Sequence, residues 1–200
     1  MNQNKNMVSI PIQNIQLDKQ NIIIKKNNEY VETFFDYISN SINIILISLI
    51  FTLIITKDIK WFYILLYLFI IDTLIVIFKI ITMRFKNSIF IRPGKCEEEG
   101  KLINILTNNF ITEEIKKSIN IEEYKMRGFP SLHMNTATSL FTLIYLFFPK
   151  YRKTTLTISP IYLLLLGSSR VYLQCHTPLQ VFAGFISGIL LSFILFKIFN

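Results

Sequence analysis

Residues 179–199 read LQVFAGFISGILLSFILFKIF and carry a single charged side chain, that of Lys197. A helix rises about 1.5 Å per residue, so about 20 apolar residues cross the roughly 30 Å hydrocarbon layer of a bilayer. Ala183, Gly184 and Gly188 form a stripe of small residues within this stretch, which indicates close packing against another membrane helix. The stretch therefore predicts a transmembrane helix with one closely packed face.

Four further apolar stretches precede it, each long enough or nearly so to span a bilayer: residues 41–56, 61–83, 132–149 and 154–173. Apolar residues make up 52% of the 200-residue chain, and its mean hydropathy is +0.44, more than a soluble domain of this size can hide from water. We therefore expect an all-α fold, a multi-pass transmembrane helical bundle of about five spans. A polar N-terminal arm at 1–40 precedes the membrane-embedded domain at 41–200, and residues 84–130 form one long helical loop.

The net charge of +8 could point to nucleic acid, but the basic residues are scattered among apolar runs rather than gathered on one polar domain. This distribution favours a membrane protein that meets anionic headgroups or phosphates, with no nucleic-acid partner. The two cysteines, Cys96 and Cys175, show no CxxC or Cys/His ligand spacing, so neither a zinc site nor a disulfide framework is indicated. The sequence is compatible with two free thiols and with a single disulfide bridge, and it does not determine the oligomeric state.

Lysine and arginine are concentrated in two short loops, at 57–60 and 150–153, and Lys197 lies close to the end of the last stretch. The positive-inside tendency places these residues in the cytosol. Alternation of the spans then places the loop at 84–130 and the turn at 170–178 on the lumenal or extracytoplasmic side. In a eukaryotic cell the membrane is expected to be that of the endoplasmic reticulum or another internal compartment.

Most polar residues that a surface position does not explain lie at three places. Residues 86–93 follow the second apolar stretch, residues 129–133 (FPSLH) open the third, and residues 169–176 (SRVYLQCH) join the fourth to the fifth. Alternation of the spans brings all three places to the same face of the membrane. The only two histidines of the chain, His133 and His176, both belong to this set.

These residue types suit phosphoryl transfer, which needs fixed positive charge around the phosphate oxygens, an in-line nucleophile and a proton donor for the leaving oxygen. Lys86, Arg92 and Arg170 can supply the charge, and the planar fork of arginine matches phosphate. One neutral imidazole can attack phosphorus while a second, protonated one gives its proton to the leaving group. Pro130-Ser131 at the start of an apolar helix adds backbone N–H groups and a hydroxyl, which predicts an anion-binding site.

The three places resemble the signature motifs of the type-2 phosphatidic acid phosphatase superfamily, over roughly residues 40–199. That family is an all-helical, metal-independent membrane fold, with the motifs Lys-x6-Arg-Pro, Pro-Ser-Gly-His and Ser-Arg-x5-His-x3-Asp. Residues 169–181 (SRVYLQCHTPLQV) are most similar to dolichyl-diphosphate phosphatases, which also carry glutamine at the position of Gln180. The resemblance implies that His176 is the nucleophile and His133 the general acid.

The resemblance also implies roles for the cationic residues. Lys86, Arg92, Ser131 and Arg170 would hold the phosphate, and Arg170 would act together with the two catalytic histidines. No metal ion or other cofactor is implied. The partner is a lipid phosphate or diphosphate in the membrane.

The chain departs from the family pattern in its first two motifs. Lys86 lies one residue too close to Arg92, so Lys79 and Arg84 compete with it as the motif lysine or its substitute. Leu132 stands where glycine or serine is usual, and a Pro-Ser-Leu-His sequence is similar to that of the inositol-phosphorylceramide synthases of the same superfamily, which transfer the phosphoryl group rather than hydrolyse.

The third motif departs at its last position, where Gln180 replaces aspartate. Its side-chain oxygen can still accept a hydrogen bond from Nδ1–H of His176 and fix the tautomer of that ring. Asp72 lies in the middle of the second stretch, where an acid is costly, and we expect a structural polar contact there rather than catalysis.

The sequence thus predicts a membrane enzyme that removes phosphate from a lipid phosphate or diphosphate, with a polyprenyl (dolichyl-like) diphosphate as first choice, through a phosphohistidine on His176. Two alternatives stay open. One is a lipid phosphotransferase of the inositol-phosphorylceramide synthase type, which Leu132 favours. The other is an inactive membrane protein that binds lipid headgroups, which the shortened first motif and Gln180 favour.

Overall fold

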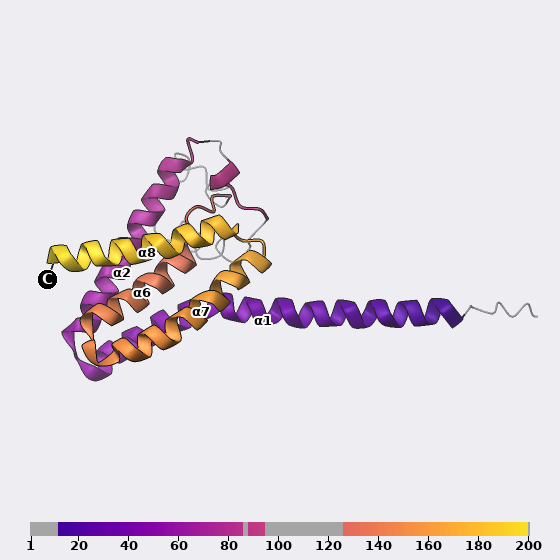
Figure 1. The fold of residues 1–200 in the computed structure, drawn as a ribbon, viewed down its shortest axis with the longest axis horizontal. Helices are drawn as coiled ribbons and strands as arrows, with labels where there is room; N and C mark the ends of the chain where they lie inside the picture. The colour runs from indigo at the N-terminus through magenta and orange to yellow at the C-terminus, as the bar shows by residue number, and fades with distance from the viewer. Residues whose placement is uncertain (1–11, 86–87, 95–125, 200) are drawn as a thin grey trace, which may run out of the picture. The chain divides into compact units, whose positions relative to one another are not determined.

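The computed structural model describes residues 12–85, 88–94 and 126–199 (Figure 1). Five long helices account for most of these residues: α1 (Ile12–Thr56), α2 (Ile59–Thr82), α6 (Leu132–Phe147), α7 (Arg152–Tyr172) and α8 (Pro178–Phe199). Two single 3-10 turns, η1 (Ser88–Phe90) and η2 (Pro149–Tyr151), complete the described elements. The described ranges contain no β-strand, only an isolated bridge between Ile91 and Arg127. The predicted all-α fold is therefore confirmed.

The chain divides into two compact units, residues 1–34 and residues 35–200. All the described contacts of the site and of the core lie in the second unit. The predicted helical loop at 84–130, including its acidic run Glu97 to Glu99, falls mostly outside the described residues.

Helix α1 begins much earlier than the polarity of the sequence suggests. The first apolar stretch starts at residue 41, whereas α1 starts at Ile12. Residues 12–40 contain no glycine or proline, so nothing in their backbone chemistry ends a helix, and polar side chains are compatible with helix wherever water surrounds it. The apolar pattern therefore reports which part of α1 meets the membrane rather than where the helix begins.

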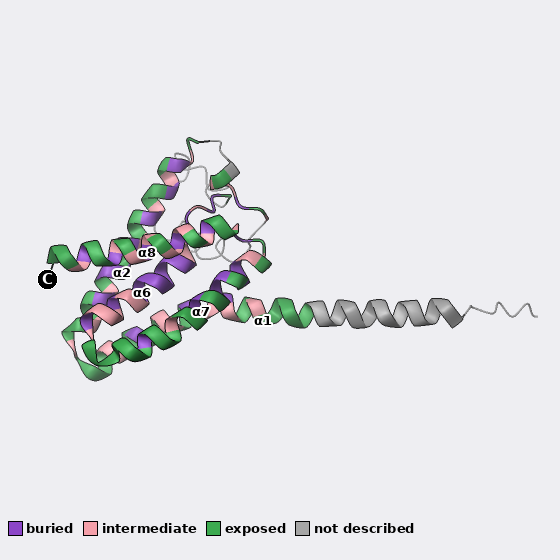
Figure 2. Ribbon diagram, in the orientation of Figure 1, coloured by how far each residue is buried: buried purple, intermediate pink, exposed green. Residues whose placement is uncertain are grey.

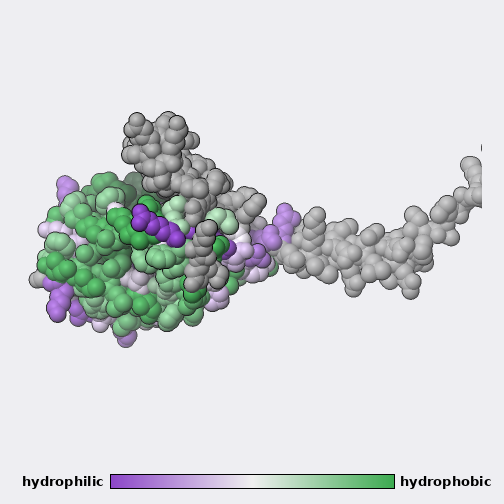
Figure 3. All heavy atoms as spheres, turned by 90° about the horizontal axis from the view of Figure 1, so that it is seen from above, coloured by the Kyte–Doolittle hydropathy of each residue, from purple (hydrophilic) through white to green (hydrophobic). Residues whose placement is uncertain are grey.

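The surface of the second unit is apolar, as a bilayer requires. Figure 3 shows that apolar residues cover most of the visible face of the helical bundle. Among the described residues, three helical segments are long and apolar enough to cross a membrane: Glu29–Thr56, Ile59–Thr82 and Pro178–Phe199. The chain is therefore an integral membrane protein, and three of the five predicted spans meet the length and composition of a span.

Helix α6 is the central helix of the bundle and lies between α7 and α8 (Figure 1). Its residues from Met134 to Leu140 are all buried (Figure 2), which is typical of a helix surrounded by protein on every side. This burial explains why the 16 residues of α6 include four with hydroxyl or amide side chains within the run NTATS (135–139). A helix that other helices enclose does not need the uniform apolarity of one that faces lipid.

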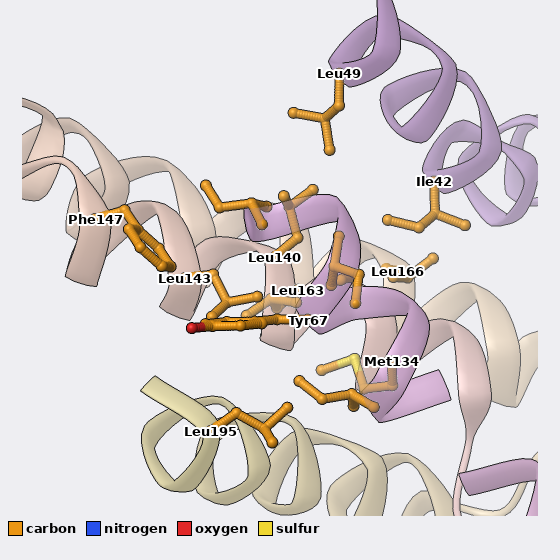
Figure 4. Close-up of a cluster of buried hydrophobic side chains, with 14 residues drawn as sticks. Ile42, Leu49, Tyr67, Met134, Leu140, Leu143, Phe147, Leu163, Leu166 and Leu195 are labelled. Carbon is orange, nitrogen blue, oxygen red and sulfur yellow. The ribbon is translucent and has the colours of Figure 1, made fainter. Parts of the chain in front are cut away.

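The apolar core takes side chains from α1, α2, α6, α7 and α8 (Figure 4). Tyr67 of α2, Leu143 and Phe147 of α6, Leu163 of α7 and Leu195 of α8 are among its buried members. Lipid tails solvate such side chains as well as a protein interior does, so close contact and dispersion hold the helices together in the bilayer. Close contact in turn needs small residues at the helix crossings.

Small residues bring α8 against α6, as the stripe in the sequence predicts. A Cβ added to Gly184 would lie 2.5 Å from the backbone oxygen of Ser131, and one added to Gly188 would lie 2.7 Å from that of Asn135. Both distances are too short for any side chain. Hydroxyl groups follow the same seam, since Ser187 Oγ donates to Asn135 Oδ1 at 2.8 Å and Ser139 Oγ to the Gly188 oxygen at 3.3 Å. The two backbones therefore touch at the end of α6 where the site is built.

The opposite end of the bundle gathers the basic loops. Asp58 caps α2 by accepting a hydrogen bond from the Lys60 amide at 3.0 Å. The rings of Trp61 and Phe148 lie 4.5 Å apart, and Lys60 Nζ lies 5.6 Å from the centre of the Phe148 ring. The loops at 57–60 and 148–152 therefore meet at one end, and the turn that carries His176 lies at the other.

Candidate active site

The end of α7 delivers His176 to the site. Gln174 has a φ of 54°, the left-handed conformation that follows many helix ends. Around it the Gln174 amide donates to the Val171 oxygen at 3.0 Å, and the Cys175 and His176 amides donate to the Arg170 oxygen at 3.0 and 3.1 Å. This pattern is a Schellman motif, which satisfies the last carbonyls of α7. The motif turns the chain back over α7 and places His176 against the backbone of Arg170.

The imidazole of His176 is buried and held through Nδ1. This atom lies 2.9 Å from the backbone oxygen of Gly128 and 3.3 Å from Oε1 of Gln180. A carbonyl oxygen only accepts hydrogen bonds, so Nδ1 carries the proton and donates it. In a neutral ring the lone pair then lies on Nε2, which is the form that can act as a nucleophile.

Gln180 connects the second and third motif regions with the loop after α2. Together with Thr177 it forms a capping box at the start of α8: the Thr177 amide donates to Gln180 Oε1 at 3.1 Å, and the Gln180 amide donates to Thr177 Oγ1 at 3.3 Å. Its Nε2 group donates to the oxygens of Ile89 at 2.9 Å and Ile91 at 2.8 Å. A carboxylate could not make these last two bonds, so the amide has a structural use that aspartate would lack.

The start of α6 is joined to this network through backbone atoms. The Ser131 amide donates to the Gln180 oxygen at 3.0 Å. Ser131 occupies the N-cap position of α6, yet its side chain makes no capping bond, and Oγ is buried without a hydrogen-bond partner among the described residues. His133, the second residue of α6, is half-buried. A buried unused hydroxyl beside the first turn of a helix is suited to bind an anion.

Two arginines are buried at the same end of the bundle. Arg170 is fully buried, and its Nη1 donates to Oγ of Ser39 in α1. Arg92 donates from Nε to the Arg127 oxygen at 3.2 Å and from Nη1 to the Cys175 oxygen at 3.3 Å. Arg92 therefore ties the loop after α2 to the turn that carries His176, and it brings its charge there.

Lys86, the predicted lysine of the first motif, lies outside the described residues. Lys79, its competitor in the sequence, is fully buried in the last turn of α2. Asp72, two turns earlier, accepts hydrogen bonds from Thr136 Oγ1 at 2.8 Å and Asn135 Nδ2 at 3.5 Å. The acid in the middle of α2 is thus tied to α6, which is the structural polar contact that its position predicts.

Three residues of this region escaped the sequence analysis. Arg127 is buried and caps the end of α2, where Nη1 donates to the Phe85 oxygen and Nη2 to the Met83 oxygen, both at 2.7 Å. Gly128 lies so close to the side chain of Gln180 that a Cβ there would displace the Gln180 amide. The position of both, directly before the Phe129-Pro130-Ser131 motif, is a signal that could have found them. Ser39 gives no such signal, because it lies in an ordinary polar stretch of α1.

The cysteine question is answered at the residue beside His176. Cys175 is buried and takes part in a disulfide. The only other cysteine of the chain is Cys96, which lies outside the described residues. Of the two possibilities that the sequence left open, a free thiol is excluded for Cys175.

Hydrogen bonds thus bring the turn after α7, the start of α8, the start of α6 and the loop after α2 to one end of the bundle. Residues 61–200 match the PAP2 superfamily. No curated protein and no solved structure gave a match. The match includes all three motif regions, whereas α1, which contributes Ser39, lies before it. The chain therefore belongs to the PAP2 superfamily, whose members are phosphatases or phosphotransferases acting on phosphate esters.

Proposed function

We propose that the protein hydrolyses a lipid phosphate or diphosphate through a phosphohistidine formed on Nε2 of His176. The observation that carries this proposal is the bond from Nδ1–H of His176 to the Gly128 oxygen, 2.9 Å long. It holds the ring in the tautomer whose lone pair lies on Nε2. The bond also supports the ring when positive charge develops on it during attack.

The first half of the reaction transfers the phosphoryl group to the enzyme. The lone pair of Nε2 forms a bond to phosphorus while the bond from phosphorus to the leaving oxygen breaks. His133, protonated at the start, gives its proton to that oxygen, so that a lipid alcohol or lipid monophosphate leaves uncharged at this position. Arg92, Arg170 and the Ser131 hydroxyl stabilise the charge on the other phosphate oxygens.

The second half releases the phosphate. Neutral His133 takes a proton from water, the water oxygen attacks phosphorus, and the bond between phosphorus and Nε2 breaks. Inorganic phosphate leaves and both histidines return to their starting forms. No metal ion enters this sequence, because the cationic side chains supply the charge that a metal would otherwise provide.

The substrate lies at the membrane boundary, with its phosphate in the site and its tail in the hydrocarbon. A polyprenyl diphosphate of the dolichyl type is the first candidate, since Gln180 and its neighbours resemble the phosphatases that act on such lipids. The disulfide of Cys175, one residue before His176, supports a lumenal or extracytoplasmic site, because disulfides persist in oxidising compartments.

The test distinguishes the roles of the two histidines by comparing substrates whose leaving groups differ in their need for a proton. His176→Ala should lower turnover of every phosphate ester by on the order of 1000-fold or more, because the nucleophile is lost. His133→Ala should do the same for a lipid phosphate but far less for an aryl phosphate whose leaving group needs no proton. Full activity of folded His176→Ala, or an equal loss with both substrates in His133→Ala, contradicts the mechanism.

Two further measurements distinguish the alternatives. Trapping a labelled phosphohistidine from a lipid diphosphate rules out an inactive headgroup-binding protein, and a chelator should leave the rate unchanged. Product analysis with and without an alcohol acceptor distinguishes hydrolysis from transfer, since a transferase would form a new phosphodiester in place of inorganic phosphate.

A further inference from the structure

A long apolar groove lies between α6, α7 and α8, next to the site. Its volume is about 1040 Å³, at the upper end of the roughly 300–1,000 Å³ of most ligand sites. Its walls include Phe141 and Tyr145 of α6, Leu156 and Leu163 of α7, and Phe185 and Ile189 of α8. These side chains give the groove an apolar wall on all three helices.

One end of the groove adjoins the predicted phosphate site. Val171 and Tyr172 at the end of α7 line it, as does Pro178 at the start of α8. Val171 directly follows Arg170, and Pro178 lies two residues after His176. A molecule that fills the groove therefore ends beside the two residues to which the proposed mechanism gives a phosphate.

The groove runs along most of the membrane-embedded length of α7. Its lining residues on this helix extend from Thr155 to Tyr172, which at about 1.5 Å per residue corresponds to about 25 Å. This length approaches the roughly 30 Å thickness of the hydrocarbon layer. The shape is that of an extended hydrocarbon chain lying along the helices, with its polar end at the membrane surface.

The groove is open to lipid along one side. Leu164 of α7 and Phe182 of α8, which both line it, are 72% and 60% exposed. A single-chain hydrocarbon can therefore enter sideways from the bilayer. Its occupant needs an apolar tail that meets this wall and an anionic head that meets Arg170.

We propose that this groove binds the hydrocarbon tail of the substrate and measures its length. The inference rests on the proposed function for the identity of the head, a phosphate or diphosphate, and adds that the tail lies between α7 and α8 against α6. A long, single apolar chain fills the groove. Its length is measured from the end of the groove next to Arg170.

The groove can be blocked at a chosen depth with little risk to the fold. Ser159 lines it from α7, is half-buried, and lies eleven residues before Arg170, or about 16 Å along the helix. Ser159→Trp fills the groove at that depth. Thr157→Trp is the matched control, because Thr157 is exposed on the same helix, does not line the groove, and uses its hydroxyl only toward its own helix, at the Lys153 oxygen.

The experiment measures turnover of alkyl phosphates of increasing tail length in mixed micelles. In the unmodified protein, kcat/KM should rise with tail length until the groove is full. Ser159→Trp should leave tails shorter than about 16 Å unaffected and should raise KM for longer tails by about tenfold or more, which corresponds to a few buried methylenes. Thr157→Trp should behave as the unmodified protein. Equal profiles for the two variants would show that the groove holds only bulk lipid and would overturn the proposal.

A second measurement tests tail binding in the groove independently of phosphatase activity. If no phosphate ester of any tail length is turned over, the proposed function is wrong. Labelling with a long alkyl phosphonate that carries a photoreactive group at its tail end then decides the groove. Labels on α6, α7 and α8 near Leu156 that Ser159→Trp abolishes support it, and labels spread evenly over the lipid-facing surface contradict it.

Discussion

Helix α8 has two very different faces. Toward α6 it is packed so closely that Gly184 and Gly188 leave no room for a methyl group, whereas toward α7 it leaves a groove of about 1040 Å³. The closed face ends at Gln180, whose backbone and side chain hold Ser131 and the loop after α2. The groove on the open face ends at Val171, Tyr172 and Pro178, which are neighbours in the chain of Arg170 and His176. If the proposals above hold, rigidity and access are separated: one face would fix the catalytic groups, and the other would admit the lipid.

The largest effect is expected from breaking the closed face. Gly188→Leu places a side chain where even a Cβ would lie 2.7 Å from the Asn135 oxygen and 2.9 Å from Cβ of Thr138, so α6 and α8 must separate. We expect loss of the folded protein in detergent, measured by size exclusion and thermal unfolding, together with loss of activity. Leu190→Phe, which enlarges a 55% exposed residue of the same helix, should unfold within a few degrees of the unmodified protein. Similar unfolding temperatures for the two variants would contradict the close packing of α8 against α6.

An intermediate effect is expected at the end of that face. Gln180→Asp restores the residue of the family motif, yet it removes the donor to the Ile89 and Ile91 oxygens and shortens the capping box. Losing two hydrogen bonds, each worth about 0.5–1.5 kcal/mol, costs about 1–3 kcal/mol in all, so we expect kcat/KM to fall by about tenfold or more.

Gln180→Glu separates the shortening from the loss of the donor, because it keeps the length of the side chain and replaces the amide with a carboxylate. It should fall almost as far as Gln180→Asp in the same assay. A gain of activity in either acidic variant would show that His176 needs a carboxylate more than the loop needs its hydrogen bonds, and would reverse our interpretation of Gln180.

The smallest effect is expected at the contact between α7 and α1. At its site end α7 is joined to α1, through Arg170 to Ser39 and through the rings of Tyr172 and Phe35, 4.5 Å apart. Ser39→Ala removes one hydrogen bond, worth about 0.5–1.5 kcal/mol, so kcat/KM should fall by about two- to tenfold. Ser41→Ala is the control, because Ser41 Oγ forms a hydrogen bond of 2.8 Å with the hydroxyl of Tyr162, eight residues before Arg170 on α7. It should change thermal stability without changing kcat/KM, and an equal loss of kcat/KM in both would exclude a specific role of Ser39.

The sequence predicted the elements of the fold better than their limits. The third apolar stretch begins at residue 132, and α6 begins at Leu132, because proline and serine mark a helix start locally. The start of α1 was missed by about 30 residues, because polarity marks the membrane and not the helix. The end of α7 carries glutamine rather than glycine at its left-handed position, so no local signal marks the Schellman motif that presents His176.

For the site, the sequence by itself determined the chemical groups: two imidazoles, several cations, a Pro-Ser helix start and a Thr-x-x-Gln capping pair, all at fixed spacings within single helix ends. Such spacings are local, and helix geometry alone fixes what they bring together. The tertiary structure alone decided that Gly128 sets the tautomer of His176 and that Ser39, in a helix outside the family match, bonds Arg170. Those contacts join residues 48 and 131 positions apart in the sequence. The identity of the residues does not indicate which distant residue each one contacts, because such contacts depend on how whole helices pack.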